Sequence, residues 1–208
     1  MRTIDQNVLD QSIGYDEYHA FIERILSQSH YLALKSIETD THNTRLNLIR
    51  MERLDKTARM TAQTRLQMAA IRKPMIWLSI TEAWCGDAAQ IVPTIQKMAA
   101  RNDKIQHRLI FREQQPAVMD AFLTKGTRSI PLTLFLEKDS SKVLGHWGPR
   151  PIELQHFVLE NLKQLDTIPD EHEHKLRFNE FQTKVQRWYA KDKTYSTQKE
   201  FLETLKKI

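Results

Sequence analysis

The sequence predicts an α/β protein: a mixed β-sheet flanked by helices, with further helices added at both ends of the chain. Two features carry this prediction. In the middle of the chain, short apolar runs typical of buried strands alternate with segments of helical periodicity. Towards both ends, apolar residues recur at helical spacing only. The 208 residues, 40% of them hydrophobic and 27% charged, suffice for one core domain with sizeable additions.

The N-terminal part of the chain is expected to be mostly helical. Residues 1–14 are mixed and polar, which is typical of a loose lead-in. A helical period then begins, and its apolar residues are Tyr15, Tyr18, Phe21, Ile22, Ile25 and Leu26. Residues 40–44 offer several helix caps.

A second helical pattern follows these caps. It predicts one long helix from about Asn43 to Ala70, which ends before Pro74 because proline cannot continue the helical hydrogen bonds. An amphipathic helix of this length needs tertiary packing to be stable. We therefore expect its apolar side chains to pack on the core or on a second subunit, namely Leu46, Ile49, Leu54 and Leu66.

The central segment alternates between the two kinds of element. Apolar runs predict strands at 75–81, 105–112, 132–136 and 143–147. Helical spacing predicts helices at 88–100, 116–123 and 151–165. Two more helical patterns occupy the tail from about His172, the second capped by residues 195–197. This gives an N-terminal helical extension (1–73), a central domain (74–166) and a C-terminal helical extension (167–208).

The chain has a single cysteine, in the stretch Trp84-Cys85-Gly86-Asp87-Ala88 between a predicted strand and a predicted helix. Free backbone N–H groups and the positive end of the helix dipole lie at such a turn. Both favour thiolate over thiol, so we expect Cys85 to be more acidic than a free cysteine. An inert buried residue is the alternative.

Residues 81–100 resemble the active-site segment of the thioredoxin family, whose signature is Trp-Cys-Gly-Pro-Cys followed by a helix with an internal proline. Trp84, Cys85 and Gly86 match the signature, and Pro93 matches the helix proline. Asp87 replaces the motif proline and Ala88 replaces the second cysteine. The resemblance implies a thioredoxin-like fold, in which Cys85 would be incompletely buried. It also implies that the resolving thiol of the family is missing.

A second stretch, residues 126–131, resembles the thioredoxin loop that ends in Ile-Pro. The resemblance implies a cis peptide between Ile130 and Pro131, close to Cys85. It further implies a substrate groove beside the cysteine, with Gly148 near its third loop. The residues expected to bind substrate there are Trp84, Gly86, Ser129, Ile130, Pro131 and Gly148.

These features favour a monothiol thiol–disulfide oxidoreductase in which Cys85 forms mixed disulfides. Because Ala88 carries no sulfur, resolution must come from glutathione or from a cysteine of another protein. The expected partners are protein thiols, protein disulfides or glutathione, with no cofactor. The alternative is a redox-inactive module of the same fold that binds a peptide or protein in the groove.

Several charged residues have both a structural and a functional interpretation. Asp87 either caps the helix that follows or exchanges a proton with Cys85, whose pKa its negative charge would raise. Glu82 is a second candidate for proton transfer, and Arg128 is either a surface residue or an anion ligand. Residues 171–174 (Glu-His-Glu-His) have a spacing that does not place both histidines on one helix face, so no metal site is expected.

Charge and composition restrict the remaining classes. The net charge is +5, and residues 45–73 contain eight basic residues against two acidic ones. A basic helix can bind nucleic acid or acidic proteins, although a solvated helix face is the simpler interpretation, so nucleic-acid binding is not expected. One cysteine, no signal-peptide pattern and no membrane-length apolar run indicate a cytoplasmic protein that does not enter a membrane. The sequence leaves the oligomeric state open.

Overall fold

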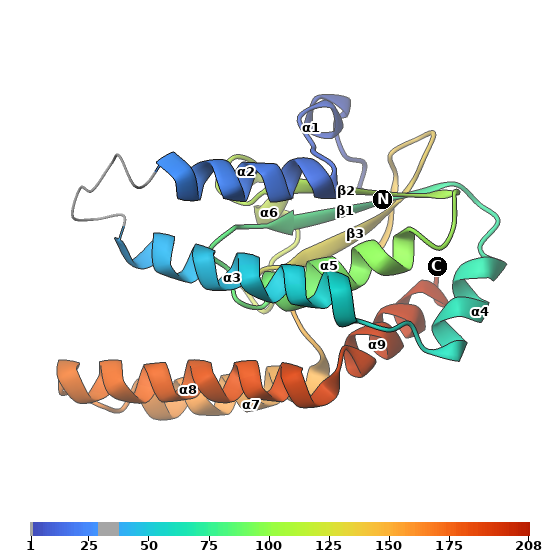
Figure 1. The fold of residues 1–208 in the computed structure, drawn as a ribbon. Helices are drawn as coiled ribbons and strands as arrows, with labels where there is room; N and C mark the ends of the chain where they lie inside the picture. The colour runs from blue at the N-terminus through green and yellow to red at the C-terminus, as the bar shows by residue number, and fades with distance from the viewer. Residues whose placement is uncertain (1, 29–37) are drawn as a thin grey trace.

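A computed structural model describes residues 2–28 and 38–208 (Figure 1). Its strands are β1 (Met75–Thr81), β2 (Ile105–Phe111), β3 (Leu132–Glu137) and β4 (Val143–Trp147). Its helices are α1 (Gln6–Asp10), α2 (Tyr15–Gln28), α3 (Glu38–Thr57), α4 (Ala62–Ala70), α5 (Ala88–Ala99), α6 (Pro116–Asp120), α7 (Ile152–Leu165), α8 (Glu171–Asp192) and α9 (Tyr195–Leu205). The α/β class and the order of central elements expected from the sequence are confirmed.

The four strands form one mixed sheet in the order β2-β1-β3-β4. β1 pairs in parallel with β2 and antiparallel with β3, and β3 pairs antiparallel with β4. Every residue of β1 is buried, as expected for an apolar strand that is covered on both faces. The end of this central strand leads directly into the stretch that carries Cys85.

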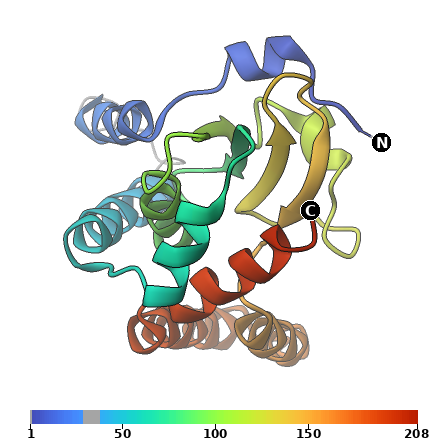
Figure 2. The same ribbon diagram turned by 90° about the vertical axis from the view of Figure 1, so that its right-hand side faces the viewer.

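The two faces of the sheet build two apolar clusters. Trp77 of β1 and Phe135 of β3 pack with Phe201 of α9, with ring centroids 4.8 and 4.9 Å from that of Phe201. α5 contributes Ile91 and Ile95 to the same cluster. The opposite face packs against α1 and α6, with members that include Ile76, Leu78, Ile80, Val8, Leu9 and Met119. Figure 2 shows α1 on one side of the sheet and α4, α5 and α9 on the other.

Residues 2–14 are bound to the sheet and do not form the loosely attached N-terminal segment that the sequence indicated. Asp5 caps α1 by accepting a hydrogen bond from the Asn7 N–H (2.8 Å). The backbone of Ile4 donates to Ser141 (3.0 Å), and Ile13 exchanges two backbone hydrogen bonds with Leu109 (2.9 and 2.8 Å). The segment therefore binds to the β3–β4 turn at one edge of the sheet and to β2 at the other, pairings that polarity along the sequence does not reveal.

The single helix predicted from Asn43 to Ala70 is wrong: it is two helices, α3 and α4, and α3 already begins at Glu38, so the expected caps lie inside it. Thr61 caps α4 by accepting from the Thr64 N–H (3.0 Å). Gln198 of α9 holds the break, because its amide accepts from the Thr61 N–H (3.0 Å) and donates to the Arg59 carbonyl (3.0 Å). A contact from the far end of the chain thus overrides helical periodicity.

Of the four apolar side chains expected to pack on the core or on a second subunit, Leu54 packs on the core of this chain. Leu54 is buried (5% exposed), whereas Leu46, Ile49 and Leu66 are 37%, 57% and 69% exposed and do not pack on the core. The predicted tail helices are present as α8 and α9, but Asp192 rather than residues 195–197 supplies the cap at the start of α9. Its carboxylate accepts from the Ser196 N–H (3.1 Å).

Candidate functional site

The stretch around Cys85 links the end of β1 to the start of α5. Cys85 lies in the turn itself, three residues before α5 begins at Ala88. The Ala88 N–H points at the Cys85 sulfur (N to Sγ, 3.5 Å), and the sulfur contacts the Ile130 carbonyl oxygen at 3.5 Å. Ile130–Pro131 is a cis peptide bond. The two segments singled out in the sequence, 84–88 and 126–131, therefore meet at the sulfur atom.

The thiol of Cys85 is buried, contrary to the expectation of an accessible and acidic thiol. The residue is only 7% exposed. Burial raises the pKa of Cys85 to about 12, and the negative charge of Asp87 acts in the same direction. The N–H groups of residues 87 and 88 oppose this rise without cancelling it. At this turn, desolvation outweighs the helix terminus.

Asp87 does not cap α5 with its side chain. Its carboxylate instead accepts two hydrogen bonds from the Arg150 guanidinium (2.6 and 3.1 Å) and one from the Tyr189 hydroxyl (2.7 Å). The Asp87 and Arg150 side chains are each 14% exposed, so this ion pair is largely desolvated. The sequence does not identify Arg150 and Tyr189 as partners of Asp87, because each lies more than sixty residues from Asp87 and has no motif of its own.

Helices α3 and α8 cover the turn from two sides (Figure 1). Asn47 of α3 donates to the Ala83 carbonyl (2.9 Å), and Gln186 of α8 donates to the Gly86 carbonyl (3.5 Å). Gln186 also accepts from Gln90 of α5 (2.7 Å). A Cβ at Gly86 would lie 3.1 Å from the Gln186 amide nitrogen, so a glycine here lets α8 approach closely. The C-terminal extension is thus part of the site.

Gly148 packs against the loop that ends in Pro131. It has φ +135°, and a Cβ there would lie 2.4 Å from the Pro131 carbonyl oxygen, so only glycine fits. The Gly148–Pro149 peptide bond is also cis. The Ser129 hydroxyl shares a hydrogen bond with Thr127 (2.7 Å). Loop 126–131 and the loop after β4 therefore pack directly on each other beside Cys85.

Trp84 is half-buried at the edge of the site, where Arg112 lies over its ring at 4.9 Å from the centroid. Trp147 at the end of β4 lies in the core against Phe201. Arg128 is engaged by Asp120 through two hydrogen bonds (2.6 and 2.7 Å).

Glu82, the second residue considered for proton transfer, is held by the loop after β2. It accepts from the Glu113 N–H (2.9 Å), and burial raises its pKa. Ser79 of β1 belongs to a buried polar cluster. Its hydroxyl lies 2.9 Å from His107 Nε2 and 2.8 Å from the Thr133 hydroxyl.

Within residues 2–28 and 38–208, no group of three or more His, Cys, Asp or Glu side chains is arranged to hold a metal ion. In the same part of the chain, no helix combines the length and apolar character needed to cross a bilayer.

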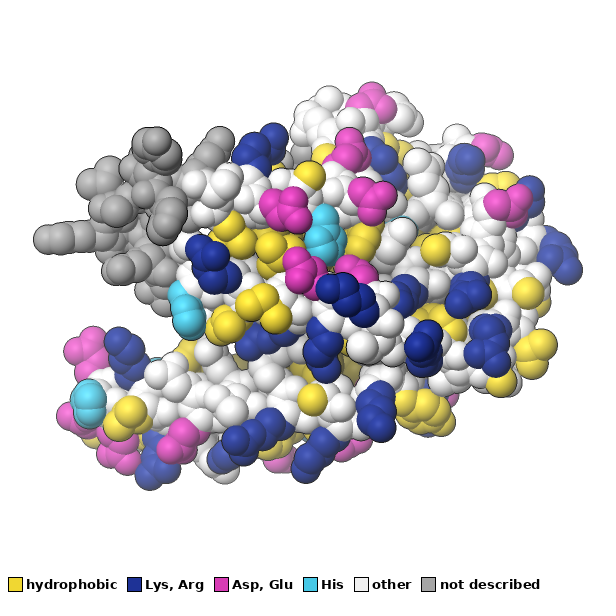
Figure 3. Space-filling view, viewed as in Figure 1, with side chains coloured by type: hydrophobic (Ala, Val, Ile, Leu, Met, Phe, Trp, Pro, Cys, Tyr) yellow, Lys and Arg dark blue, Asp and Glu magenta, His cyan; other side chains and the backbone are white. Residues whose placement is uncertain are grey.

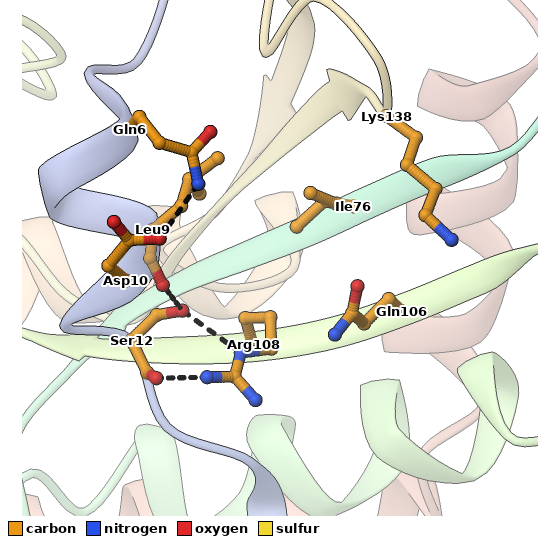
Figure 4. Close-up of a pocket in the computed structure, with 8 residues that line it drawn as sticks. All are labelled: Gln6, Leu9, Asp10, Ser12, Ile76, Gln106, Arg108 and Lys138. Carbon is orange, nitrogen blue, oxygen red and sulfur yellow. Dashed lines mark hydrogen bonds between the residues drawn. The ribbon is translucent and has the colours of Figure 1, made fainter.

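A pocket of about 460 Å³ lies away from Cys85, between α1 and the edge formed by β1 and β2 (Figure 4). Its lining residues are Gln6, Leu9, Asp10, Ser12, Ile76, Gln106, Arg108 and Lys138. Arg108 donates to the Ser12 hydroxyl (2.9 Å) and carbonyl, and Gln6 donates to Asp10 (2.8 Å). The bonds from Arg108 of β2 to Ser12 hold the N-terminal segment on the sheet.

The sheet, the turn that carries Cys85 and the loop 126–131 define a protein of the thioredoxin class. A sequence model described as thioredoxin matches residues 34–167, and the chain belongs to this family. No curated protein matches the chain.

Two solved structures are similar in fold. One is a protein of unknown function from Pseudomonas aeruginosa, with 13% sequence identity and a TM-score of 0.59 over 99% of this chain and 98% of that one. The other is an HIV epitope scaffold, with 13% identity and a TM-score of 0.58 over 98% of each chain. At this identity the likeness concerns the fold alone, and it extends over the helices added at both ends.

Proposed function

We propose that this protein is a thioredoxin-fold module that binds a partner protein in the cytoplasm and holds its single cysteine as a neutral thiol. The observation that carries the proposal is the enclosed sulfur of Cys85, whose pKa is raised to about 12. At pH 7 such a thiol is almost entirely protonated, and thiolate is the species that attacks a disulfide. Because Ala88 carries no sulfur and Cys85 is the single cysteine, no internal thiol can complete a dithiol cycle.

The loops that form the family's groove support a binding role. Gly86 follows Cys85 in the chain, the Ile130 carbonyl before Pro131 contacts the sulfur, and Gly148 packs against the Pro131 carbonyl. α8 closes over the Cys85 turn through Gln186 and Tyr189. These contacts pack α8 and the two loops against the Cys85 turn, and none of them requires a reactive sulfur.

Intact-protein mass spectrometry after incubation with oxidised glutathione at pH 7.5 tests the proposal. We expect no adduct on the native protein and complete modification once the protein is unfolded in urea, which is the control for a reactive thiol. A glutathione adduct that forms on the native protein as fast as on the unfolded one would contradict the proposal.

A second candidate is the monothiol oxidoreductase, favoured by the Ala88 N–H that points at the Cys85 sulfur (3.5 Å). Opening of the structure around the Cys85 turn would expose the sulfur, and this N–H would then stabilise a thiolate. The Cys85 thiolate would attack a partner disulfide and expel one partner sulfur as a thiolate. Glutathione or another protein thiol would then attack the mixed disulfide and release Cys85. A glutathione adduct that forms only when contacts of α8 are removed, for example in Tyr189→Phe, would support this candidate.

A further inference from the structure

Two arginines of α3 lie beside the Cys85 turn without a carboxylate partner. Arg50 is half-buried and donates to the Asn47 side-chain oxygen (2.7 Å), and Arg53 donates to the Gln90 side-chain oxygen (3.4 Å). A Cβ at Gly86 would lie 3.8 Å from an Arg50 nitrogen. Among the described residues, neither arginine forms an ion pair, whereas Arg150 on the other side of the same turn pairs with Asp87.

The surroundings of Arg50 are unfavourable for its charge. Burial lowers the pKa of Arg50, and the neighbouring charge of Arg53 lowers it further. A partly desolvated cation beside a second cation is costly unless an anion compensates both. Neutral amide oxygens are the only acceptors that the described residues give these two guanidinium groups. The missing compensation points to an anion supplied by another molecule.

Two exposed aliphatic side chains accompany these arginines. Leu46 is 37% exposed and Ile49 is 57% exposed. The spacing of residues 46, 49, 50 and 53 places them on one stripe of α3, because residues three and four apart are neighbours on a helix surface. Figure 3 shows Lys and Arg side chains along the recess that separates α3 from α8. The stripe therefore combines apolar contact with unpaired positive charge.

We propose that this α3 stripe, residues 46, 49, 50 and 53, binds an acidic peptide segment of a partner protein. The proposal rests on the binding role proposed above, since it names the partner of that module. The peptide sets apolar side chains on Leu46 and Ile49, and its carboxylates accept charge-assisted hydrogen bonds from Arg50 and Arg53. Single-stranded nucleic acid fits less well, because its bases stack on aromatic side chains and these four residues include none.

Fluorescence anisotropy with a defined probe tests this surface. The probe is a rhodamine-labelled, C-terminally amidated eight-residue peptide of alternating leucine and glutamate, and the comparison peptide has glutamine in place of glutamate. We expect the acidic peptide to bind at least tenfold more tightly than the glutamine peptide, and to weaken as salt is raised. The double variant Arg50→Gln/Arg53→Gln should weaken its binding about tenfold.

A control variant has the same change in net charge. Arg101→Gln/Lys138→Gln removes two exposed cations at the far end of β1 and α5 and should leave the affinity within twofold. The α3 double variant should melt no lower than the parent protein, since it relieves repulsion between two cations.

Three results would overturn the proposal: no binding of the acidic peptide, equal binding of both peptides, or equal losses in the two double variants. Tighter binding of a labelled oligonucleotide at the same residues would replace the peptide by nucleic acid. Glutathionylation of Cys85 is measured on the same samples. A reactive Cys85 with intact peptide binding contradicts only the proposed function, whereas an inert Cys85 without peptide binding contradicts only this proposal.

Discussion

Substitution of Asp87 by asparagine separates the two roles of this carboxylate, in stability and in the acidity of Cys85. Asparagine has nearly the same shape and keeps one oxygen, which can still accept from Tyr189. It replaces the other oxygen, which accepts both bonds from Arg150 (2.6 and 3.1 Å), with an NH₂ group. Two donors then face each other, and the Arg150 cation loses its counter-charge.

The magnitude follows from the burial of the pair. Breaking a buried ion pair by removing one partner costs about 3–5 kcal/mol. Both side chains are 14% exposed and Gln155 still accepts from Arg150, so we expect the lower end, about 3 kcal/mol. For a protein of this size 1 kcal/mol shifts Tm by about 2–4 °C, so Tm should fall by about 6–12 °C. Thermal unfolding followed by circular dichroism measures this shift.

The matched control is Asp120→Asn, which breaks a bidentate pair with Arg128 of similar distances (2.6 and 2.7 Å) in which both side chains are 48% exposed. We expect little change in Tm, because solvent screens exposed pairs. The pKa of Cys85 should fall in Asp87→Asn, but not to that of a free cysteine, because burial is the larger cause of the rise. Equal and small Tm shifts in both variants would refute the idea that the Asp87 pair fastens α8 and the loop after β4 to the turn.

Three further predictions concern residues that shape the fold around the site. Gly148→Ala should cost about 2 kcal/mol or more, because its Cβ would lie 2.4 Å from the Pro131 carbonyl oxygen; Gly145→Ala, which meets mainly the Ile208 side chain, should cost less, and urea unfolding compares them. Gln198→Ala should cost about 2 kcal/mol in urea unfolding, because the half-buried Thr61 N–H, the buried Thr64 hydroxyl and the Arg59 carbonyl lose their Gln198 partner. Burial lowers the pKa of His107 to about 3, so the unfolded chain binds this proton first as the pH falls. The contribution of neutral His107 to stability is therefore complete above about pH 6.5 and is lost as the pH falls towards 3. His107→Gln should flatten that part of the curve of urea midpoint against pH.

The sequence was sufficient for the sheet and for the place of Cys85. A buried strand such as 75–81 can be recognised from an apolar run of neighbouring residues, and two short motifs predict that Cys85 and Pro131 lie close together. These signals survive because each depends on neighbouring residues. The same holds for α2, whose apolar period matches the face that it buries.

The environment of Cys85 could not be predicted in the same way. Its acidity depends on burial in an apolar cluster that includes Tyr18 of α2 and Met51 of α3. It also depends on a carboxylate whose partners, Arg150 and Tyr189, come from distant parts of the chain. A helix terminus alone predicts a low pKa, and only the assembled structure shows that desolvation exceeds it. The helix break held by Gln198 has the same origin, since a long-range hydrogen bond overrides local periodicity.

The charge pattern illustrates a further limit. Counting basic residues between 45 and 73 identifies a positive segment but does not distinguish which cations are solvated. Only the structure shows that Arg50 is half-buried beside Arg53 and that neither forms an ion pair with a described residue.

The pH dependence of iodoacetamide labelling of Cys85 tests the central claim most directly, with the urea-unfolded protein as the reference. The enclosed thiol, whose pKa is raised to about 12, predicts a native labelling rate at pH 7.5 that is orders of magnitude below the unfolded rate. The native rate should rise only above about pH 10, whereas the unfolded rate should show a midpoint near the free-cysteine value of about 8.5. A native midpoint at or below about 8.5 would contradict the account and make the monothiol oxidoreductase the leading function.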